Sequence, residues 1–531
     1  MNIDYHNFMY LLVSISGPLI LFTYSLIPRS ILNKNVYKSA KIAFYLSFIS
    51  LGLALISTLN VFIHKNLFFE LPIYKSIHFS VYLDNLTSVM LLLVNFLLTV
   101  VTRFSVNYLS GDSNQGGFTK WLAMTGAAVL MLISAGNIIQ FTIFWSLTSY
   151  SLHKLLVFYP NRYEALLAAR KKFIISRIGD ICLLGAIICI WLLFKTFEFK
   201  NIFTQINLYH LGFYSFDSII MNLLAVLLIL GAMLKSAQFP FHSWLPDTME
   251  TPTPVSALMH AGVINAGGYL ILRLNPLVVL SPVAMSVLAI VGAFTALFAS
   301  LVMLTHASIK RSLAFSTVAQ MGFMMFECGL GLFGLALLHI IAHSLYKAYA
   351  FLSSGSIYKI RRQLWLPAET NKKLHVRFIL ILVTLFITIL LVSHYLSEVP
   401  VQANHLLFYS ILVMAIAYSL WNLWLVISDI QLIALGVFAS IVIISIHLFF
   451  QYLITTYVIN NTWTNTVFDS LYGIIVLSVI LILFLSVLVL QTELTIWSKY
   501  KFVQRLYVHA RNGFYFSTIA NRVVTVFYPI K

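Results

Sequence analysis

Hydrophobic runs long enough to cross a bilayer as helices, about 20 residues each, follow one another along almost the whole chain. Short segments with charge, proline or glycine separate them. Only 9% of the 531 residues are charged and 60% are hydrophobic, whereas a soluble domain carries about 25% charged residues. The sequence therefore excludes a soluble enzyme and predicts an all-α polytopic membrane protein embedded in the lipid bilayer.

The runs predict about 15 transmembrane helices. Most of the 33 Lys and Arg residues fall in the loops that follow alternate helices and in the C-terminal tail. Because basic loops remain on the cytoplasmic side, we expect the N-terminus outside and the C-terminus in the cytoplasm. This pattern explains the net charge of +17 without a nucleic-acid partner. The expected helix bounds are 9–27, 41–63, 86–108, 121–136, 138–158, 173–194, 219–240, 254–274, 277–304, 311–329, 331–353, 376–396, 405–426, 428–451 and 469–491.

One predicted helix carries a lysine and is then interrupted by proline. Lys235 lies inside a hydrophobic run, and Pro240 and Pro246 follow it. A lysine at mid-membrane costs about 2.5–3.5 kcal/mol on insertion scales, and irregular backbone at that depth persists only beside protein or a wet cavity. With His260 on the next helix, the segment indicates an ion pathway. Two proline-kinked packing helices are the alternative.

A second polar group lies on the predicted helix 331–353. His339, His343 and Lys347 are four residues apart and therefore share one helix face. The local sequence offers neither a carboxylate nor a cysteine to complete a zinc site, so a proton relay is favoured. Hydrogen bonding between helices is the alternative. The three cysteines form no CxxC motif, and we expect no cofactor in this chain.

Further ionisable residues could serve at the entry of such a pathway or modulate it. Asp180 lies three residues after Arg177, so the two can pair on one helix face, and His153 and Lys154 end a helix with a serine-rich face. The tail 497–531 mixes basic and aromatic residues and predicts an interfacial amphipathic element. It could anchor to anionic lipid, or it could dock a cytoplasmic partner. The residues considered for docking are Tyr507, His509, Arg511, Phe514 and Tyr515.

These motifs identify a family. The run from Lys235-Ser-Ala-Gln through Trp-Leu-Pro-Asp247 to Pro-Thr-Pro-Val-Ser-Ala-Leu-Met-His260 resembles the core of the antiporter-like subunits of NADH–quinone oxidoreductase and of Mrp antiporters. The resemblance implies two inverted five-helix repeats, each with a broken helix and a buried lysine. By position, Lys235 would be the lysine of the first repeat. His260 and Lys310 would form a linking relay, and Lys347 would connect to the second half.

Two positions depart from that family. Its pumps place a glutamate after the tryptophan of the helix 138–158, paired with the broken-helix lysine, whereas this chain has Ser146. The second broken helix offers only His394 where a lysine or glutamate is expected. The resemblance divides the chain into N-terminal helices (1–80), an antiporter-like core (81–400), C-terminal helices (401–496) and the tail (497–531).

Three segments, 151–162, 169–180 and 507–515, are similar to the DabB-type membrane subunit of a two-part inorganic-carbon accumulation complex. That resemblance implies a subunit of the bacterial inner membrane that conducts H⁺ or Na⁺ and is not itself an enzyme. It also implies a large cytoplasmic partner of the DabA type, which resembles a carbonic anhydrase and would hold the zinc. Scarce carboxylates favour H⁺ over Na⁺. The alternatives are the proton-pumping subunit of an NADH–quinone oxidoreductase or Mrp-type complex, and a membrane anchor without a pathway.

Overall fold

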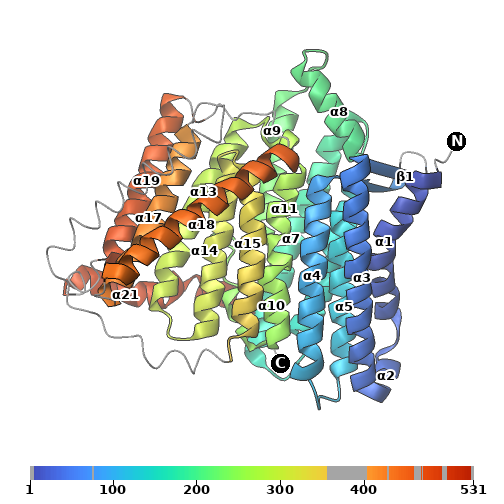
Figure 1. Ribbon diagram of the computed structural model, residues 1–531, viewed down its shortest axis with the longest axis horizontal. Helices are drawn as coiled ribbons and strands as arrows, with labels where there is room; N and C mark the ends of the chain where they lie inside the picture. Colours follow the sequence, from blue (N-terminus) through green and yellow to red (C-terminus); the bar gives the residue numbers. More distant parts are fainter. Residues whose placement is uncertain are drawn as a thin grey trace.

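The computed structural model describes residues 5–74, 77–355, 403–426, 430–459, 468, 470–492 and 499–527. Long helices run side by side through the molecule (Figure 1), which confirms the all-α membrane fold. A helix satisfies its own backbone hydrogen bonds, as a lipid environment requires. The first helices are α1 (Tyr5–Leu26), α2 (Arg29–Leu32), α3 (Val36–His64), α4 (Asn85–Tyr108), α5 (Gln115–Ile133), α6 (Ile138–Leu156), α7 (Tyr163–Phe194) and α8 (Phe199–His210).

The central helices hold the predicted residues Lys235, His260 and Lys347, and the C-terminal helices flank them (Figure 1). The central set is α9 (Ser218–Lys235), α10 (Thr253–Ala261), α11 (Ala266–Arg273), α12 (Asn275–Val278), α13 (Pro282–Thr305), α14 (Ile309–Gly329) and α15 (Phe333–Leu352). The C-terminal set is α17 (Ala403–Val426), α18 (Ile430–Tyr457), α19 (Leu471–Thr492), α21 (Lys501–Arg511) and α22 (Phe516–Phe527).

Within the described residues, 11 helices are long and apolar enough to cross a membrane. The helices α6 and α14 have 19 and 21 residues but are not among them, because polar residues lower their hydropathy. The count of about 15 therefore stays a prediction, and the expected helix 376–396 lies outside the described residues. The helix α7 begins ten residues before its expected start at 173, so Lys171 and Lys172 are buried helical residues rather than loop residues.

A two-stranded antiparallel hairpin, β1 (Leu67–Tyr74) and β2 (Ile77–Leu83), is the main departure from the all-helical prediction. It lies with α8 at one end of the bundle, here termed the hairpin end (Figure 1). The other end, termed the tail end, holds α2, the loops 109–114, 157–162 and 306–308, and the helices α21 and α22. These two ends are the landmarks for the site.

The predicted interruption near Pro240 is confirmed. The helix α9 stops at Lys235, residues 236–245 form turns, and a short 3-10 helix, η2 (Pro246–Glu250), precedes α10. A second 3-10 segment, η3 (Val263–Asn265), separates α10 from α11. Side chains replace the lost helical hydrogen bonds, since the Phe239 N–H donates to Thr295 Oγ1 at 3.1 Å. The broken helix therefore rests against α13.

The helices α13 and α14 cross at glycine contacts. A Cβ added to Gly322 would lie 2.5 Å from the backbone nitrogen of Ala296, and one added to Gly292 would lie 2.4 Å from that of Phe326. Only glycine permits backbones to approach so closely. This crossing fixes α14 in place, and α14 carries several partners of the buried ionisable residues.

Candidate ion pathway

Lys235, at the end of α9, is buried with 7% of its side chain exposed. Its Nζ donates to Ser149 Oγ at 2.7 Å and contacts the Trp145 carbonyl at 3.4 Å. The ammonium also lies over the Trp145 indole, 4.5 Å from the ring centroid, which is a favourable cation–π position. The serine-rich face of α6 therefore faces the lysine of the broken helix.

The carboxylate nearest to this lysine site comes from α7. Asp180 Oδ2 accepts a hydrogen bond from Ser146 Oγ at 2.7 Å, and Arg177 Nη2 lies 2.9 Å from the same oxygen. The predicted Arg177–Asp180 pair is thus present. Next to Asp180, α7 and α9 touch closely, because a Cβ on Gly179 would lie 3.9 Å from the Gly231 carbonyl. Asp180 is thus a carboxylate next to Ser146, the position at which the family resemblance leads us to expect a glutamate.

Lys172 is a second buried amine that the sequence analysis missed. Its Nζ donates to the Ser149 carbonyl at 2.5 Å, and the residue is 3% exposed. Because Ser149 also binds Lys235 through its hydroxyl, one residue of α6 contacts both amines. Both Lys171 and Lys172 fall between the expected helices 138–158 and 173–194, and only the early start of α7 places them inside the protein.

The two other predicted residues of α6 differ in placement. His153 is half-buried, and its Nδ1 lies 3.3 Å from the Ala169 carbonyl. Lys154 is exposed and lies over the Tyr150 ring at 5.3 Å from its centroid. The structure therefore brings His153, but not Lys154, towards the buried face of α7.

His260 lies deep between α10, α14 and α15. It is fully buried, its Nδ1 lies 3.1 Å from Thr317 Oγ1, and its ring stacks on Phe351 with centroids 4.3 Å apart. Its Nε2 has no hydrogen-bond partner among the described residues. One ring nitrogen is thus held in place while the other remains able to take or give a proton.

Lys347 is fully buried on α15. Its Nζ donates to Ser316 Oγ at 2.8 Å and to the Leu313 carbonyl at 3.2 Å, both on α14. Lys310, the second residue of α14, is half-buried, and its side chain forms no ion pair or hydrogen bond with any other described residue. The structure joins Lys347 to α14 but gives no contact between Lys310 and the buried groups.

The histidines of α15 have an acidic partner, contrary to the expectation from the local sequence. Glu327 Oε2, near the end of α14, lies 2.9 Å from His339 Nδ1, and only 3% of the Glu327 side chain is exposed. The His339 and His343 rings follow at a centroid distance of 6.2 Å. His343 lies one helical turn from both His339 and Lys347 on α15. We term Glu327, His339, His343, Lys347 and His260 the ion line; they lie on α14, α15 and α10, and both α14 and α10 pack against α15.

Several buried polar atoms of this candidate pathway have no partner within the described part of the chain. Such atoms are costly in an apolar interior, so each of them has hydrogen-bonding capacity that a proton, an ion or water could use. They are Asp180 Oδ1, Gln238 Oε1, Asn265 Oδ1, His260 Nε2, His339 Nε2 and both ring nitrogens of His343. His394 lies outside the described residues.

The C-terminal tail docks on the core of its own chain. Phe516 packs edge-on against Phe239 of the broken segment at 4.7 Å between centroids. Ser517 Oγ donates to Asp247 Oδ2 at 2.5 Å, and Lys171 Nζ contacts the same carboxylate oxygen. Phe514 is half-buried against Phe298. The four other residues considered for docking are exposed: Tyr507, His509, Arg511 and Tyr515.

Two models of known protein families match this chain. The family model for the transmembrane part of NADH:quinone oxidoreductases and Mrp antiporters matches residues 135–434. This chain belongs to the NADH:quinone oxidoreductase/Mrp antiporter family. A second model, for the N-terminus of chain 5 of NADH-ubiquinone oxidoreductase (complex I), matches residues 73–119 of this antiporter-family chain. No cluster of three metal-ligating side chains occurs in the described residues.

Curated relatives of this antiporter-family chain include transporter subunits. It is 48% identical over 285 residues to the probable inorganic carbon transporter subunit DabB2 of Halothiobacillus neapolitanus, covering 54% of this chain and 51% of that protein. It is 46% identical over 274 residues to the probable subunit DabB of Hydrogenovibrio crunogenus, covering 51% and 52%. The chloroplastic NAD(P)H-quinone oxidoreductase subunit 5 of Lemna minor is 41% identical over 284 residues, covering 53% and 38%. The chain spans about half, or less, of the length of these relatives.

Solved structures share the fold. A chain in the Mrp complex from Dietzia sp. has a TM-score of 0.59 at 19% identity, with 97% of this chain and 55% of that chain covered. A chain in the archaeal membrane-bound sulfane sulfur reductase has a TM-score of 0.58 at 18% identity, with 96% and 99% covered. Both are parts of multisubunit membrane complexes. At these identities the likeness concerns the fold alone.

Proposed function

We propose that this chain is the membrane subunit of an energy-coupled inorganic-carbon transporter. It conducts H⁺, or Na⁺, down its gradient, and a cytoplasmic zinc subunit resembling carbonic anhydrase (DabA type) uses that energy to accumulate CO₂ or bicarbonate. The observation that carries the ion-conducting role is the burial of four ionisable residues, Lys235 on α9 and His260, His343 and Lys347 of the ion line. The DabB relatives support the assignment to inorganic carbon.

The line suits protons better than sodium. Amines and imidazoles exchange protons, whereas Na⁺ is a hard cation that needs several oxygen ligands. The Lys235 Nζ would release a proton towards the segment 236–245, and the free Nε2 of His260 would receive it. His343 would then pass it to Lys347 Nζ or to His339, whose Nδ1 lies 2.9 Å from Glu327 Oε2. Asp180 would hold the charged form of Lys235 until transfer.

The orientation in a bacterial inner membrane belongs to the same proposal. The tail end carries the basic loops, with Arg29, Lys34 and Arg162 among their residues. Positive loops favour the cytoplasmic side, so the tail end faces the cytoplasm and the hairpin end faces outside. The exposed face of α21 is then available to a cytoplasmic partner.

Growth of a CO₂-requiring bacterial strain in ordinary air tests the proposal. The gene for this chain, expressed together with its partner gene, should restore growth. The same pair with Lys235→Ala should not, at matched membrane levels. Lys200→Ala, an exposed lysine of α8, is the control and should restore growth fully. Full rescue by Lys235→Ala would refute ion coupling and favour a passive anchor.

A proton-pumping subunit of a redox-driven or Mrp-type complex is the second candidate, which the identity to chloroplastic NAD(P)H-quinone oxidoreductase subunit 5 favours. Affinity purification of the full chain from its native membrane separates the two. A zinc-containing soluble subunit in stoichiometric amount supports the carbon transporter. Recovery of redox subunits with iron–sulfur absorbance, or of further antiporter subunits, supports the second candidate.

A further inference from the structure

A pocket of about 220 Å³ opens at the tail end, between the docked tail and the core. The start of α14, the loop after the α9 break, the first turn of α7 and the junction of α21 with α22 form its walls. The buried ion line described above does not include it. Its volume is below the roughly 300–1,000 Å³ of pockets that hold drug-sized ligands, so any occupant is small.

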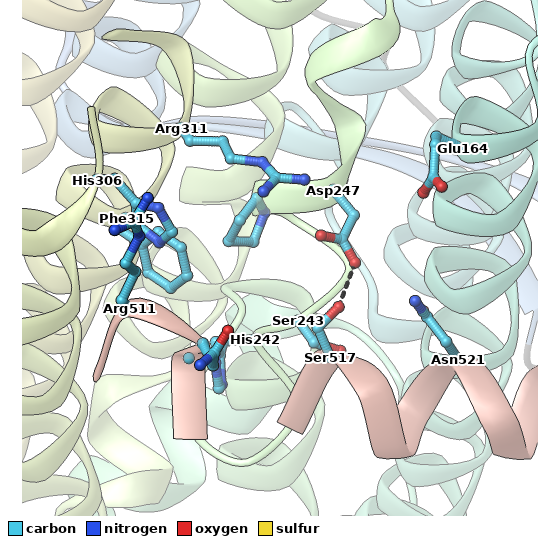
Figure 2. Close-up of a pocket in the computed structure, with 13 residues that line it drawn as sticks. Glu164, His242, Ser243, Asp247, His306, Arg311, Phe315, Arg511, Ser517 and Asn521 are labelled. Carbon is cyan, nitrogen blue, oxygen red and sulfur yellow. Dashed lines mark hydrogen bonds between the residues drawn. The ribbon is translucent and has the colours of Figure 1, made fainter. Parts of the chain in front are cut away.

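Two arginines dominate the pocket. Arg311 enters from α14 and Arg511 from the end of α21, and both line the cavity (Figure 2). Neither guanidinium has an ion pair or a hydrogen bond among the described residues. Two unneutralised guanidiniums in one small pocket attract an anion, and their forked donors match planar oxyanions in bidentate fashion.

The acidic residues of the pocket do not cancel this charge. Asp247 Oδ2 is bound by Ser517 and contacted by Lys171 Nζ, so this carboxylate already has a cation. Figure 2 shows its other oxygen turned away from Ser517. Glu164 lies on the far side of Asp247 from the arginines (Figure 2). The pocket therefore presents two guanidiniums, the second oxygen of Asp247, and the Glu164 carboxylate on the side away from the arginines.

Two histidines add donors and acceptors. His242, with 2% exposed, has an unpartnered Nδ1, and His306 has an unpartnered Nε2, within the described residues. Burial lowers the pKa of His242 to about 4. Burial, followed by the charges of Arg311 and Arg511, lowers the pKa of His306. Both rings are therefore neutral at pH 7, and each neutral ring has one donor and one acceptor nitrogen.

We propose that this pocket is a binding site for bicarbonate. The three oxygens of the planar anion would face Arg311 and Arg511, while its hydroxyl would donate to Asp247 or to an imidazole nitrogen. An anion without a hydroxyl leaves that acceptor unpaired, which is costly in a partly buried site. The choice of bicarbonate rests on the proposed function, since a cytoplasmic partner that hydrates CO₂ produces this ion at the tail end.

Isothermal titration of the purified full chain in lipid nanodiscs, at constant ionic strength and pH 8 in a sealed cell, tests the site. Bicarbonate should bind saturably, and nitrate, which is planar but has no hydroxyl, should bind at least tenfold more weakly. Arg311→Gln and Arg511→Gln should each weaken bicarbonate binding at least tenfold. Arg505→Gln, an exposed arginine of α21 outside the pocket, should bind as the parent does.

Equal affinity of the Arg511 and Arg505 variants, or equal binding of nitrate and bicarbonate, overturns the proposal. Tighter binding of inorganic phosphate than of bicarbonate replaces it with a phosphate site. Arg311→Lys keeps the charge but loses the fork, and its affinity should fall between those of the parent and Arg311→Gln. That result excludes simple misfolding as the cause of lost binding.

The titration can fail independently of the growth assay. Absent bicarbonate binding with growth rescued by the gene pair overturns the site and leaves the proposed function standing. Saturable binding with full rescue by Lys235→Ala retains the site and overturns ion coupling.

Discussion

Exchange of the residues at positions 146 and 180 tests whether Asp180 replaces the family glutamate. Ser146 Oγ and Asp180 Oδ2 are 2.7 Å apart, so a glutamate at position 146 would bring a second carboxylate next to Asp180. We take a separation of about 4 Å, because the longer side chain can turn away. With an effective dielectric constant near 20, two like charges at that distance repel by about 4 kcal/mol.

Ser146→Glu alone should therefore impair ion passage by up to about a thousandfold, since each 1.36 kcal/mol is a factor of ten. Asp180→Ser alone removes the carboxylate that accepts from Ser146 Oγ. A hydrogen bond to a charged group contributes roughly 1.5–3 kcal/mol, so a loss of at least about tenfold is expected. The double variant Ser146→Glu/Asp180→Ser restores one carboxylate and should recover much of the parent rate.

Proton uptake into liposomes that contain the purified complex, followed with a pH-sensitive dye, measures these rates. The variants are compared at equal protein content, and only variants that melt at the same temperature as the parent are included. Folding defects are thereby separated from defects in conduction. A double variant no faster than Ser146→Glu would show that the two positions do not share one role. The same conclusion follows if Ser146→Glu is as fast as the parent.

Three further predictions concern contacts that the structure makes specific. Glu327→Gln keeps the shape beside His339 but removes its charge, and should slow proton uptake at least about tenfold, whereas Glu70→Gln on the exposed hairpin strand should not. Arg273→Ala strands Asp84, whose carboxylate accepts at 2.7 Å, and should cost about 3–5 kcal/mol. Arg162→Ala breaks the ion pair with Glu250, in which both side chains are about half exposed, and should lower the free energy of unfolding by under about 1 kcal/mol. Thermal unfolding in detergent measures the loss of stability in the Arg273 and Arg162 variants. Gly322→Ala, forced against the Ala296 backbone, should lower the yield of folded protein, while Gly52→Ala, which meets nothing within 4 Å, should leave it unchanged.

The lengths of the hydrophobic runs predicted the helices well, because the thickness of the bilayer sets the number of apolar residues that a spanning helix needs. The expected helix 86–108 is α4 at Asn85–Tyr108, and 311–329 is α14 at Ile309–Gly329. The prediction of helix bounds failed for residues that are buried by contacts with the rest of the protein rather than by lipid. Lys171 and Lys172 look like a basic loop in the sequence, but α7 carries them into the protein, where Ser149 and Asp247 provide their partners. The hairpin escaped notice because its strands are too short to resemble a span.

Within the site, sequence spacing identified only groups that share a helix. Arg177 and Asp180 pair at a separation of three residues, and His339 and His343 follow each other at four. The pairs that decide the chemistry join different helices. Asp180 reaches Ser146 from α7 to α6, and Glu327 reaches His339 from α14 to α15. No period in one sequence encodes such contacts, because helix packing alone sets which faces meet.

The C-terminal tail binds a third kind of surface, besides the anionic lipid and the cytoplasmic partner that the sequence analysis considers: the core of its own chain. An amphipathic helix needs an apolar surface to cover, and the broken segment after α9 provides one in Phe239, which Phe516 covers. The polar contact of Ser517 with Asp247 then fixes the register of α22 against the core. The opposite face of the tail leaves Tyr507 and His509 exposed. A partner bound to that face of α21 would therefore be separated only by residues 512–515 from the start of α22, where Phe516 covers Phe239, four residues after Lys235 in the sequence.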